Sequence, residues 1–214
     1  MKRIPIIVLA IILISGMAYA TVPYPYGNYE LTRTGDLKQV YRDVDAKYTV
    51  LAQSEKNSTF PWDTKSYATL QAPEVVEAKV NFDADHKFMS SEEREQELAE
   101  MHQIYTDDVI NFTVGLYSSP GISGGYSYTE IKRDRTYNSK VVLETDDGTR
   151  YEPTYIYSGS SSLIGRHWWA YNSVDFPRYD ENNNQIINEN TKWIKLWVIS
   201  HSERIFFEFV FKDQ

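Results

Sequence analysis

Few residues in the sequence have side chains and spacing that suggest ligand binding. His167 directly precedes Trp168 and Trp169, so a titratable ring stands beside two large aromatic surfaces. Tryptophan and tyrosine side chains stack on sugar rings and anchor protein interfaces. Neighbouring residues of a strand face opposite ways, so we expect one tryptophan in the core and the other exposed. These three residues are candidate binding residues, and a structural position at a strand edge is the alternative for His167.

Tyrosine is the second source of candidates, because the chain contains 17 Tyr beside 9 Phe and 5 Trp. An exposed tyrosine patch would consist of Tyr24, Tyr26, Tyr29, Tyr126 and Tyr128. We include Tyr126 and Tyr128 among the binding residues. The alternative is the ordinary use of tyrosine in an exported β-protein.

The sequence predicts no catalytic residue, no metal ligand and no cofactor. The four histidines do not form the helical pair of a zinc hydrolase, and no glycine-rich phosphate loop is present. Residues 180–184 resemble the first half of a calcium loop, but Gln185 and Thr191 replace its essential Gly and Glu. We expect a solvated turn there, with a looser calcium site as the alternative. The polar cluster at 83–86 is likewise interpreted as a turn rather than a cation site.

Composition narrows the class of partner. The 22 Lys and Arg residues stand against 30 Asp and Glu residues, a net charge of −8, which argues against binding to nucleic acid. The chain contains no cysteine, so it has no disulfide, thiol nucleophile or zinc–thiolate site. With 42% hydrophobic residues among 214, the chain can bury a sizeable core without disulfides or zinc–thiolate sites.

The first twenty residues have the layout of a secretory signal. Lys2 and Arg3 precede an uncharged apolar stretch, and Ala18-Tyr19-Ala20 places small residues at the positions that a signal peptidase reads. The pattern predicts an extracytoplasmic protein, periplasmic or secreted. Because the apolar stretch 4–20 reaches the lower limit for crossing a bilayer, about 17 residues, an uncleaved N-terminal membrane anchor is the alternative.

The rest of the chain mostly shows the two-residue alternation of strands. One amphipathic helix is expected near 90–105, since Ser90 and Glu93 form a capping box. Asp146-Asp147-Gly148-Thr149 indicates a hairpin turn, and residues 158–162 are expected to form a polar loop. The expected strands are 47–53, 74–82, 108–117, 126–132, 140–144, 151–157, 166–176, 193–199 and 204–211.

This spacing predicts a mainly β fold, a single antiparallel β-sandwich. Trp193 and Trp197 share a face of the closing hairpin, which we expect to be the core face. Over about the last twenty residues this hairpin resembles the ending of immunoglobulin-like domains, so we expect an immunoglobulin-like sandwich. Three regions are predicted: a signal peptide or anchor at 1–20, an extended lead-in with accessory strands at 21–71, and the β-sandwich domain at 72–214.

The functional hypothesis follows from the aromatic surplus and the predicted export. We expect an exported, non-enzymatic β-sandwich protein that binds a protein or glycan partner in the cell envelope, with membrane contact only through residues 4–20 if they are not cleaved. One alternative is an extracytoplasmic hydrolase whose acidic pair the sequence does not single out. The other is a structural subunit of an envelope assembly that pairs through an edge strand.

Overall fold

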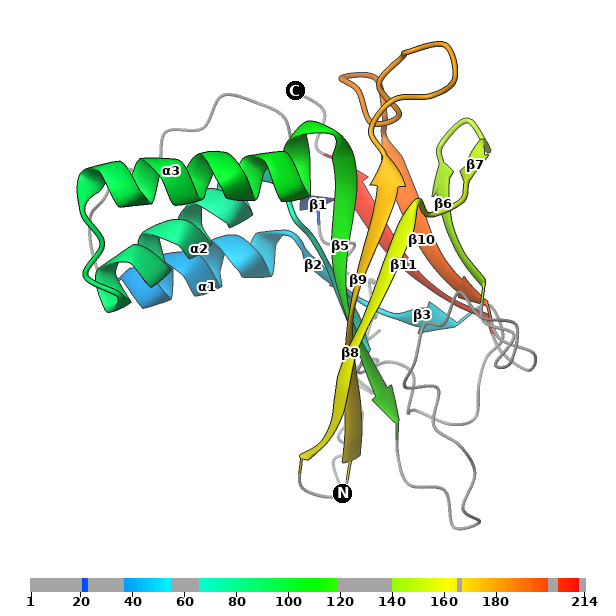
Figure 1. Cartoon of the computed structure of the whole chain (residues 1–214). Coiled ribbons are helices and arrows are strands. Elements are labelled where there is room, and N and C mark those ends of the chain that lie inside the picture. The colour runs from blue at the N-terminus through cyan, green and yellow to red at the C-terminus, as the bar shows by residue number, and fades with distance from the viewer. Residues whose placement is uncertain are drawn as a thin grey trace, which may run out of the picture.

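The computed structural model describes residues 21–22, 37–54, 66–118, 140–164, 167–199 and 204–211. Within these ranges the fold is mainly β, with two sheets and three α-helices (Figure 1). All strand pairs are antiparallel except for the pairing of the first short strand with the last strand. The predicted β-rich fold is therefore confirmed.

The first sheet, sheet A, has six strands in the order β1-β11-β10-β6-β7, with β3 also paired to β11. Its strands are β1 (Thr21–Val22), β3 (Gln53–Ser54), β6 (Lys140–Thr145), β7 (Arg150–Tyr151), β10 (Trp193–Ile199) and β11 (Arg204–Phe211). Sheet B has five strands in the order β2-β4-β5-β9-β8. Its strands are β2 (Thr49–Leu51), β4 (Tyr67–Leu70), β5 (Val109–Ser118), β8 (Tyr155–Ile164) and β9 (His167–Pro177).

The core lies between the inner faces of the two sheets. Alternate residues of β10 and β11 are buried, as the two-residue period of a strand requires. The rings of Phe112 on β5 and Phe209 on β11 are 5.4 Å apart and join the two sheets, and Phe176 on β9 packs edge-on against Phe112. All three are fully buried. Hydrophobic burial between the sheets is thus the main stabilising contribution.

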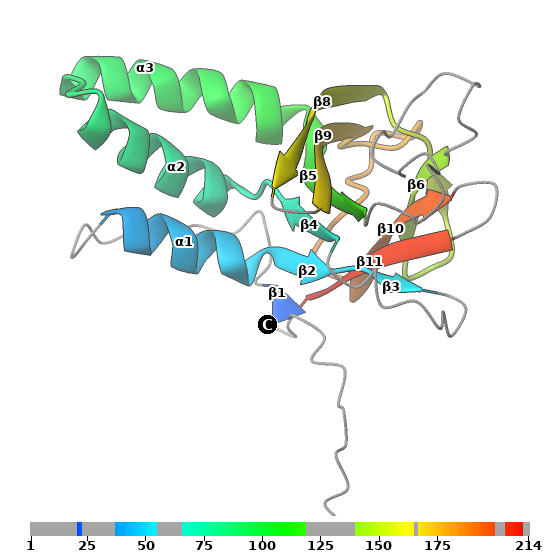
Figure 2. The same ribbon diagram turned by 90° about the horizontal axis from the view of Figure 1, so that it is seen from below.

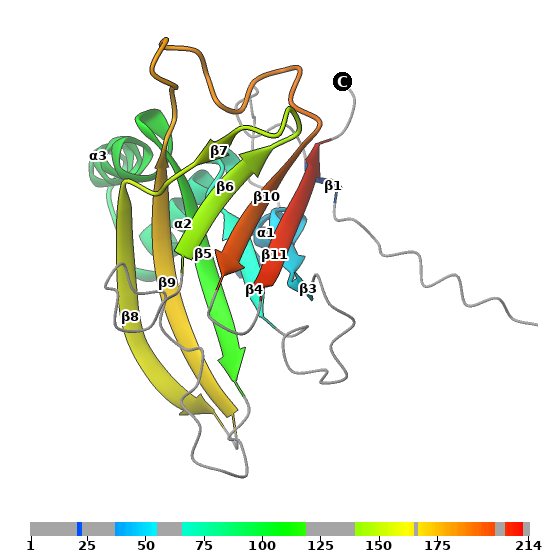
Figure 3. The ribbon, with the colours of Figure 1, turned by 90° about the vertical axis from the view of Figure 1, so that its right-hand side faces the viewer.

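The helices form one layer that extends beside sheet B, in the order α1, α2, α3 (Figures 1 and 2). They are α1 (Leu37–Lys47), α2 (Pro73–His86) and α3 (Ser91–His102), the last continued by a π-helical turn, η2 (Gln103–Asp107). Figure 3 shows sheet A in front of this layer, with its strands turned toward the viewer. The helices therefore leave the outer face of sheet A uncovered on that side.

Helix α2 corrects the predicted strand at 74–82. Val76, Ala78 and Val80 do alternate with polar residues, but Val75 is buried beside Val76. Val75 and Val76 are both buried because α2 lies between two other helices. The two-residue alternation of a half-buried strand would leave one of them exposed. Pro73 starts the helix at its first turn, where a missing N–H costs nothing.

Helix α1 is an element that the sequence pattern did not predict. Val40 and Val44 are four residues apart and share one face of α1, and Tyr48, directly after the helix, is fully buried. The strand expected over 47–53 begins where α1 ends and is divided into β2 and β3. With three helices described, the expectation of a single helix is wrong.

The predicted helix near 90–105 is confirmed down to its capping box. The Glu93 N–H donates to the Ser90 hydroxyl at 3.2 Å, and the Ser90 N–H donates to the Glu93 carboxylate at 2.7 Å. The hairpin turn at Gly148 is also confirmed, because it joins β6 to β7. The strands expected at 108–117, 166–176, 193–199 and 204–211 match β5, β9, β10 and β11, and the strand expected at 151–157 divides into β7 and β8.

The polar loop expected at 158–162 is wrong, because β8 runs through it. Serine fits an edge strand that pairs on one side only, and β8 pairs only with β9 in the described part of sheet B. A register shift between Ser158 and Ser161 absorbs the small residues as a bulge. Gly159 is needed there, since a Cβ would lie 2.6 Å from the carbonyl oxygen of Tyr171. The strand expected at 126–132 and the signal at 1–20 lie outside the described residues.

Candidate functional site

The outer face of sheet A carries a regular array of aromatic and charged side chains. Strand register places Trp197 of β10 between Val142 of β6 and Phe206 of β11. One row along, Lys195 lies between Glu144 and Glu208. The opposite row sets Ile199 between Lys140 and Arg204. We call these residues, together with Arg150 opposite Glu144, the sheet A array.

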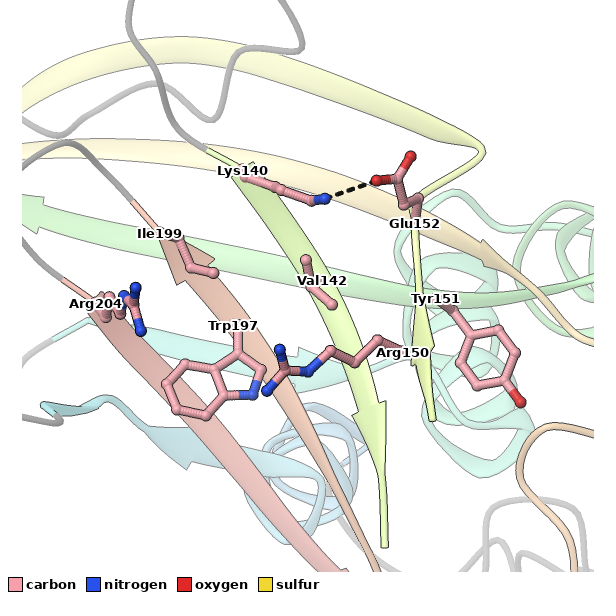
Figure 4. Close-up of a pocket in the computed structure, with 8 residues that line it drawn as sticks. All are labelled: Lys140, Val142, Arg150, Tyr151, Glu152, Trp197, Ile199 and Arg204. Carbon is pink, nitrogen blue, oxygen red and sulfur yellow. Dashed lines mark hydrogen bonds and ion pairs between the residues drawn. The ribbon is translucent and has the colours of Figure 1, made fainter. Parts of the chain in front are cut away.

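A cavity of about 430 Å³ opens on this array. Its volume is within the range of small-molecule sites, about 300–1,000 Å³. Trp197 and Val142 lie at the centre of the residues drawn in Figure 4, with charged side chains around them. The described lining consists of Lys140, Val142, Arg150, Tyr151, Glu152, Trp197, Ile199 and Arg204.

Trp197 gives the cavity its aromatic surface. Its ring packs on Phe206 with the centroids 4.9 Å apart, and this contact holds the indole in place across the strand pair. The indole Nε1–H is buried and has no hydrogen-bond acceptor in the described structure. Buried polar groups are normally paired, so this donor marks a position where an acceptor is missing.

Cationic side chains surround the indole. Arg150 donates its Nε–H to Glu144 at 2.8 Å, and Lys140 pairs with Glu152 at 2.7 Å. The lysine and Glu152 side chains are 59% and 76% exposed, so their ion pair contributes little stability. Arg204 is the third cationic residue among the described residues of the lining. The cavity is thus locally basic although the chain as a whole is acidic.

The β6–β7 hairpin positions Arg150 and Tyr151. The Asp147 carboxylate accepts hydrogen bonds from the Thr145 hydroxyl at 2.7 Å and from the Thr149 N–H at 2.9 Å. Gly148 adopts φ +84°, which a glycine supplies without strain. These contacts fix a tight turn, so the two residues that follow it enter the cavity at a defined register.

Tyr151 enters the site as a neutral phenol. Burial raises its pKa above the ordinary value of a tyrosine, and the negative charges of Asp147 and Asp180 add to that rise. The hydroxyl therefore keeps its proton at neutral pH and can donate a hydrogen bond. Figure 4 shows its ring at the side of the lining, farther from the indole than Arg150.

Sequence reasoning missed this site because it placed the wrong face of β10 in the core. Trp193 and Trp197 do share a face, but the core face holds Ile194, Leu196 and Val198, and the tryptophans lie opposite. Lys195 lies between the two tryptophans, with its ammonium 4.6 Å from the Trp193 ring centroid. The Trp-Lys-Trp alternation was the signal available, since a lysine marks the outward face.

The predicted site residues lie where the structure describes no side chains. His167, Trp168 and Trp169 open strand β9 of sheet B, where Trp168 pairs with Ser118 and Leu163. The structure describes their backbone and not their side chains. Tyr126 and Tyr128 lie outside the described residues. Whether these five residues bind a partner remains a prediction.

The segment at 180–184 forms the predicted turn. One oxygen of the Asp180 carboxylate accepts the N–H groups of Asn182 and Asn184, both at 2.8 Å. These bonds lower the pKa of Asp180. Its oxygens are thus used within the turn. The described residues contain no cluster of three potential metal ligands, and the polar group at 83–86 is the last turn of α2 rather than a separate turn.

Comparison with known proteins gives no family assignment. No protein-family model, curated protein or solved structure matches this chain at a significant level. None of the described helices is both long and apolar enough to cross a membrane. The chemistry of the sheet A cavity is therefore the basis for assigning a function.

Proposed function

We propose that this protein is an exported, non-enzymatic β-sandwich that binds a glycan of the cell envelope in the sheet A cavity. The observation that carries the proposal is the indole of Trp197 at the centre of that cavity, surrounded by hydrogen-bonding side chains. An indole face stacks on the apolar face of a sugar ring, and the polar groups around it bind the hydroxyls.

The sandwich architecture is the fold that this proposal uses. The inner faces of both sheets contribute to a single buried cluster, and Phe112 and Phe209 meet across it. Stacking of two sheets around one core is the arrangement of a β-sandwich, and the immunoglobulin-like form is the variant we infer. Such a scaffold presents its outer faces and end loops to partners. Export is supported by the signal-like pattern of residues 1–20.

The lining favours binding over hydrolysis. Glycosidases use two carboxyl groups on either side of the scissile bond. Among the eight described residues of the lining, Glu152 is the one carboxylate, and it is paired with Lys140. A glycan-binding role needs only the aromatic surface and the donors that the cavity already presents.

Glycan binding can be tested on an array of purified envelope glycans and their oligosaccharides. We expect the protein to bind at least one class of glycan, and Trp197→Ala to weaken that binding at least tenfold, as loss of a tryptophan anchor does. Tyr157→Ala is the matched control, because Tyr157 is an aromatic residue of sheet B, 57% exposed, and not part of the cavity lining.

Two results would reject the proposal. One is that the protein binds no glycan in the array. The other is that the Trp197→Ala variant, shown to be folded by its thermal unfolding, binds as tightly as the parent. Capture of a protein partner that Trp197→Ala releases, without any glycan bound, would assign the cavity to a protein ligand instead.

A further inference from the structure

Two side chains of the cavity, Trp197 and Arg150, carry hydrogen-bond donors that have no acceptor in the described part of the structure. The Nε1–H of Trp197 is buried without a partner in the described structure. Arg150 uses its Nε–H for Glu144, and its two terminal nitrogens have no partner among the described residues. Figure 4 shows the guanidinium of Arg150 directed toward the nitrogen-bearing edge of the indole. The Arg150 side chain is 69% exposed and can shift, so a ligand group that enters between it and the indole can accept hydrogen bonds from both.

The geometry of the donors indicates which acceptor fits. A guanidinium is a planar fork that matches the two oxygens of a carboxylate. A sugar hydroxyl has one oxygen, so it can satisfy the indole N–H but does not match the fork. A carboxylate can accept from the arginine and still offer a lone pair to the indole.

Charge supports the same conclusion. The described lining contains three cations, Lys140, Arg150 and Arg204, and one carboxylate, Glu152; Glu144, paired with Arg150 beside the lining, leaves an excess of one positive charge. This basic cavity stands out in a chain with a net charge of −8. The Lys140–Glu152 pair is largely exposed, so an incoming anion can replace Glu152 at little cost.

We propose that the glycan bound by this protein is acidic, and that the carboxylate of a uronic acid residue binds between Arg150 and the indole N–H of Trp197. The inference rests on the proposed glycan-binding function and adds the chemical class of the ligand. The sugar ring packs on the indole while Lys140 and Arg204 attract the negative charge of neighbouring residues.

The test uses alginate, polygalacturonate and hyaluronan, each in native form and with its carboxyl groups reduced to alcohols. The reduced polymers keep their sugar rings and carry a neutral hydroxymethyl group in place of each carboxylate. We expect the protein to bind at least one native polymer, and to bind its reduced form at least about tenfold more weakly, because a charge-assisted contact is lost. Binding of the native polymer should also weaken as salt is added.

Three variants locate the effect. Arg150→Gln should weaken binding of the native polymer about tenfold or more, with no comparable effect on the reduced polymer. Arg42→Gln on helix α1 makes the same change in net charge away from the cavity lining and should bind like the parent. Glu152→Gln removes the carboxylate that competes for Lys140 and should tighten binding.

The outcomes separate the two proposals. If a reduced or neutral glycan binds as tightly as the acidic one, and Trp197→Ala abolishes both, the glycan site stands and the acidic ligand is wrong. Equal binding by Arg150→Gln and the parent also overturns the acidic ligand. If the protein binds none of the polymers in either form and no glycan of the envelope array, both proposals are overturned.

Discussion

The outer faces of the two sheets are both aromatic, yet they differ in chemistry. The outer face of sheet A combines Trp197 and Phe206 with lysine, arginine and glutamate side chains. The outer face of sheet B combines tyrosines with threonine and serine, and it includes Tyr155, Tyr157 and Tyr171, which are exposed. Aromatic content alone therefore does not separate a binding face from a packing face.

The helices account for the difference. Burial raises the pKa of Tyr67 on β4 to about 12, and Tyr171, Asp45 and Tyr41 add to the rise. Asp45 and Tyr41 belong to α1, so this part of sheet B lies against the helical layer. The Thr49 and Thr69 hydroxyls are hydrogen-bonded to each other on the same face, at 2.7 Å.

Sheet A differs because its array faces away from the three described helices (Figure 3). Its charged side chains pair with one another across the strands, as Lys195 does with Glu208 at 3.2 Å. The aromatic surface between them is available to a ligand. The comparison therefore separates the part of sheet B around Tyr67, which packs against the helices, from a face of sheet A that supports binding.

The largest effect should come from truncating an inner phenylalanine of β11, compared with truncating an outer phenylalanine of the same strand. Phe209→Ala removes a fully buried ring of β11 and should destabilise the protein by about 3–5 kcal/mol. Phe206→Ala, three residues earlier, should cost clearly less stability but weaken glycan binding, because Phe206 supports the Trp197 ring. Chemical denaturation measures the first effect, and equal losses in the two variants would show that the sheet A array belongs to the core.

An intermediate effect is expected at Gly115 on the outer face of sheet B. A Cβ there would lie 2.4 Å from Cε1 of Tyr67, so Gly115→Ala should cost about 1–3 kcal/mol through overpacking. Glycan binding should not change, because Gly115 lies on sheet B and is not among the described residues of the cavity lining. Truncating the ring in Tyr67→Ala should relieve the clash, so the double variant should lose less stability than the two single losses added together. Strict additivity would contradict the packing role.

The smallest effect is a pair of opposite pH dependences. Burial raises the pKa of Asp175 on β9, whose carboxylate accepts a hydrogen bond from Asn111. Its contribution to stability is present below the unfolded pKa, 3.8, and is lost as the pH rises through the folded pKa. The free energy of unfolding of Asp175→Asn should therefore increase relative to that of the parent as the pH rises from acidic to neutral.

Asp147 in the β6–β7 turn should behave in the opposite way. Hydrogen bonds from Thr145 and Thr149 lower its pKa, so its contribution is present above 3.8 and is lost as the pH falls through the folded pKa. Asp147→Ala should cost less than about 1 kcal/mol at neutral pH, because the turn is exposed, and almost nothing in strong acid. Unfolding curves of both variants from pH 2.5 to 7, a range chosen to span the ordinary aspartate value, check the two signs. Slopes of the same sign would contradict these assignments.

Local signals in the sequence were sufficient where one residue pattern determines one structure. The Ser90–Glu93 capping box and the Asp147-Gly148 turn each satisfy backbone groups by themselves, so neither depends on the rest of the fold. The strands of the closing hairpin were equally predictable, because β10 and β11 alternate over their full length, but the face of β10 that enters the core was not.

Patterns that depend on tertiary neighbours were not predictable in the same way. The alternation at 76–82 fits a strand, but in the structure this segment is a helix that packs between two other helices. Serines at 158–162 resemble a loop until β9 supplies a pairing partner. The cavity brings Arg150 and Trp197 together from distant parts of the chain, so it depends on the pairing of β6 with β7 and β10.

The most direct measurement of the central claim is the NMR signal of the Trp197 indole N–H during titration with the glycan that the protein binds most tightly. The signal is assigned by its disappearance in Trp197→Phe. A hydrogen bond formed by this unpaired donor should shift the signal downfield as the site saturates, with the other tryptophan signals changing less. An unchanged Trp197 signal, while those of Trp168 or Trp169 shift at saturation, would place the binding site on sheet B and contradict the account.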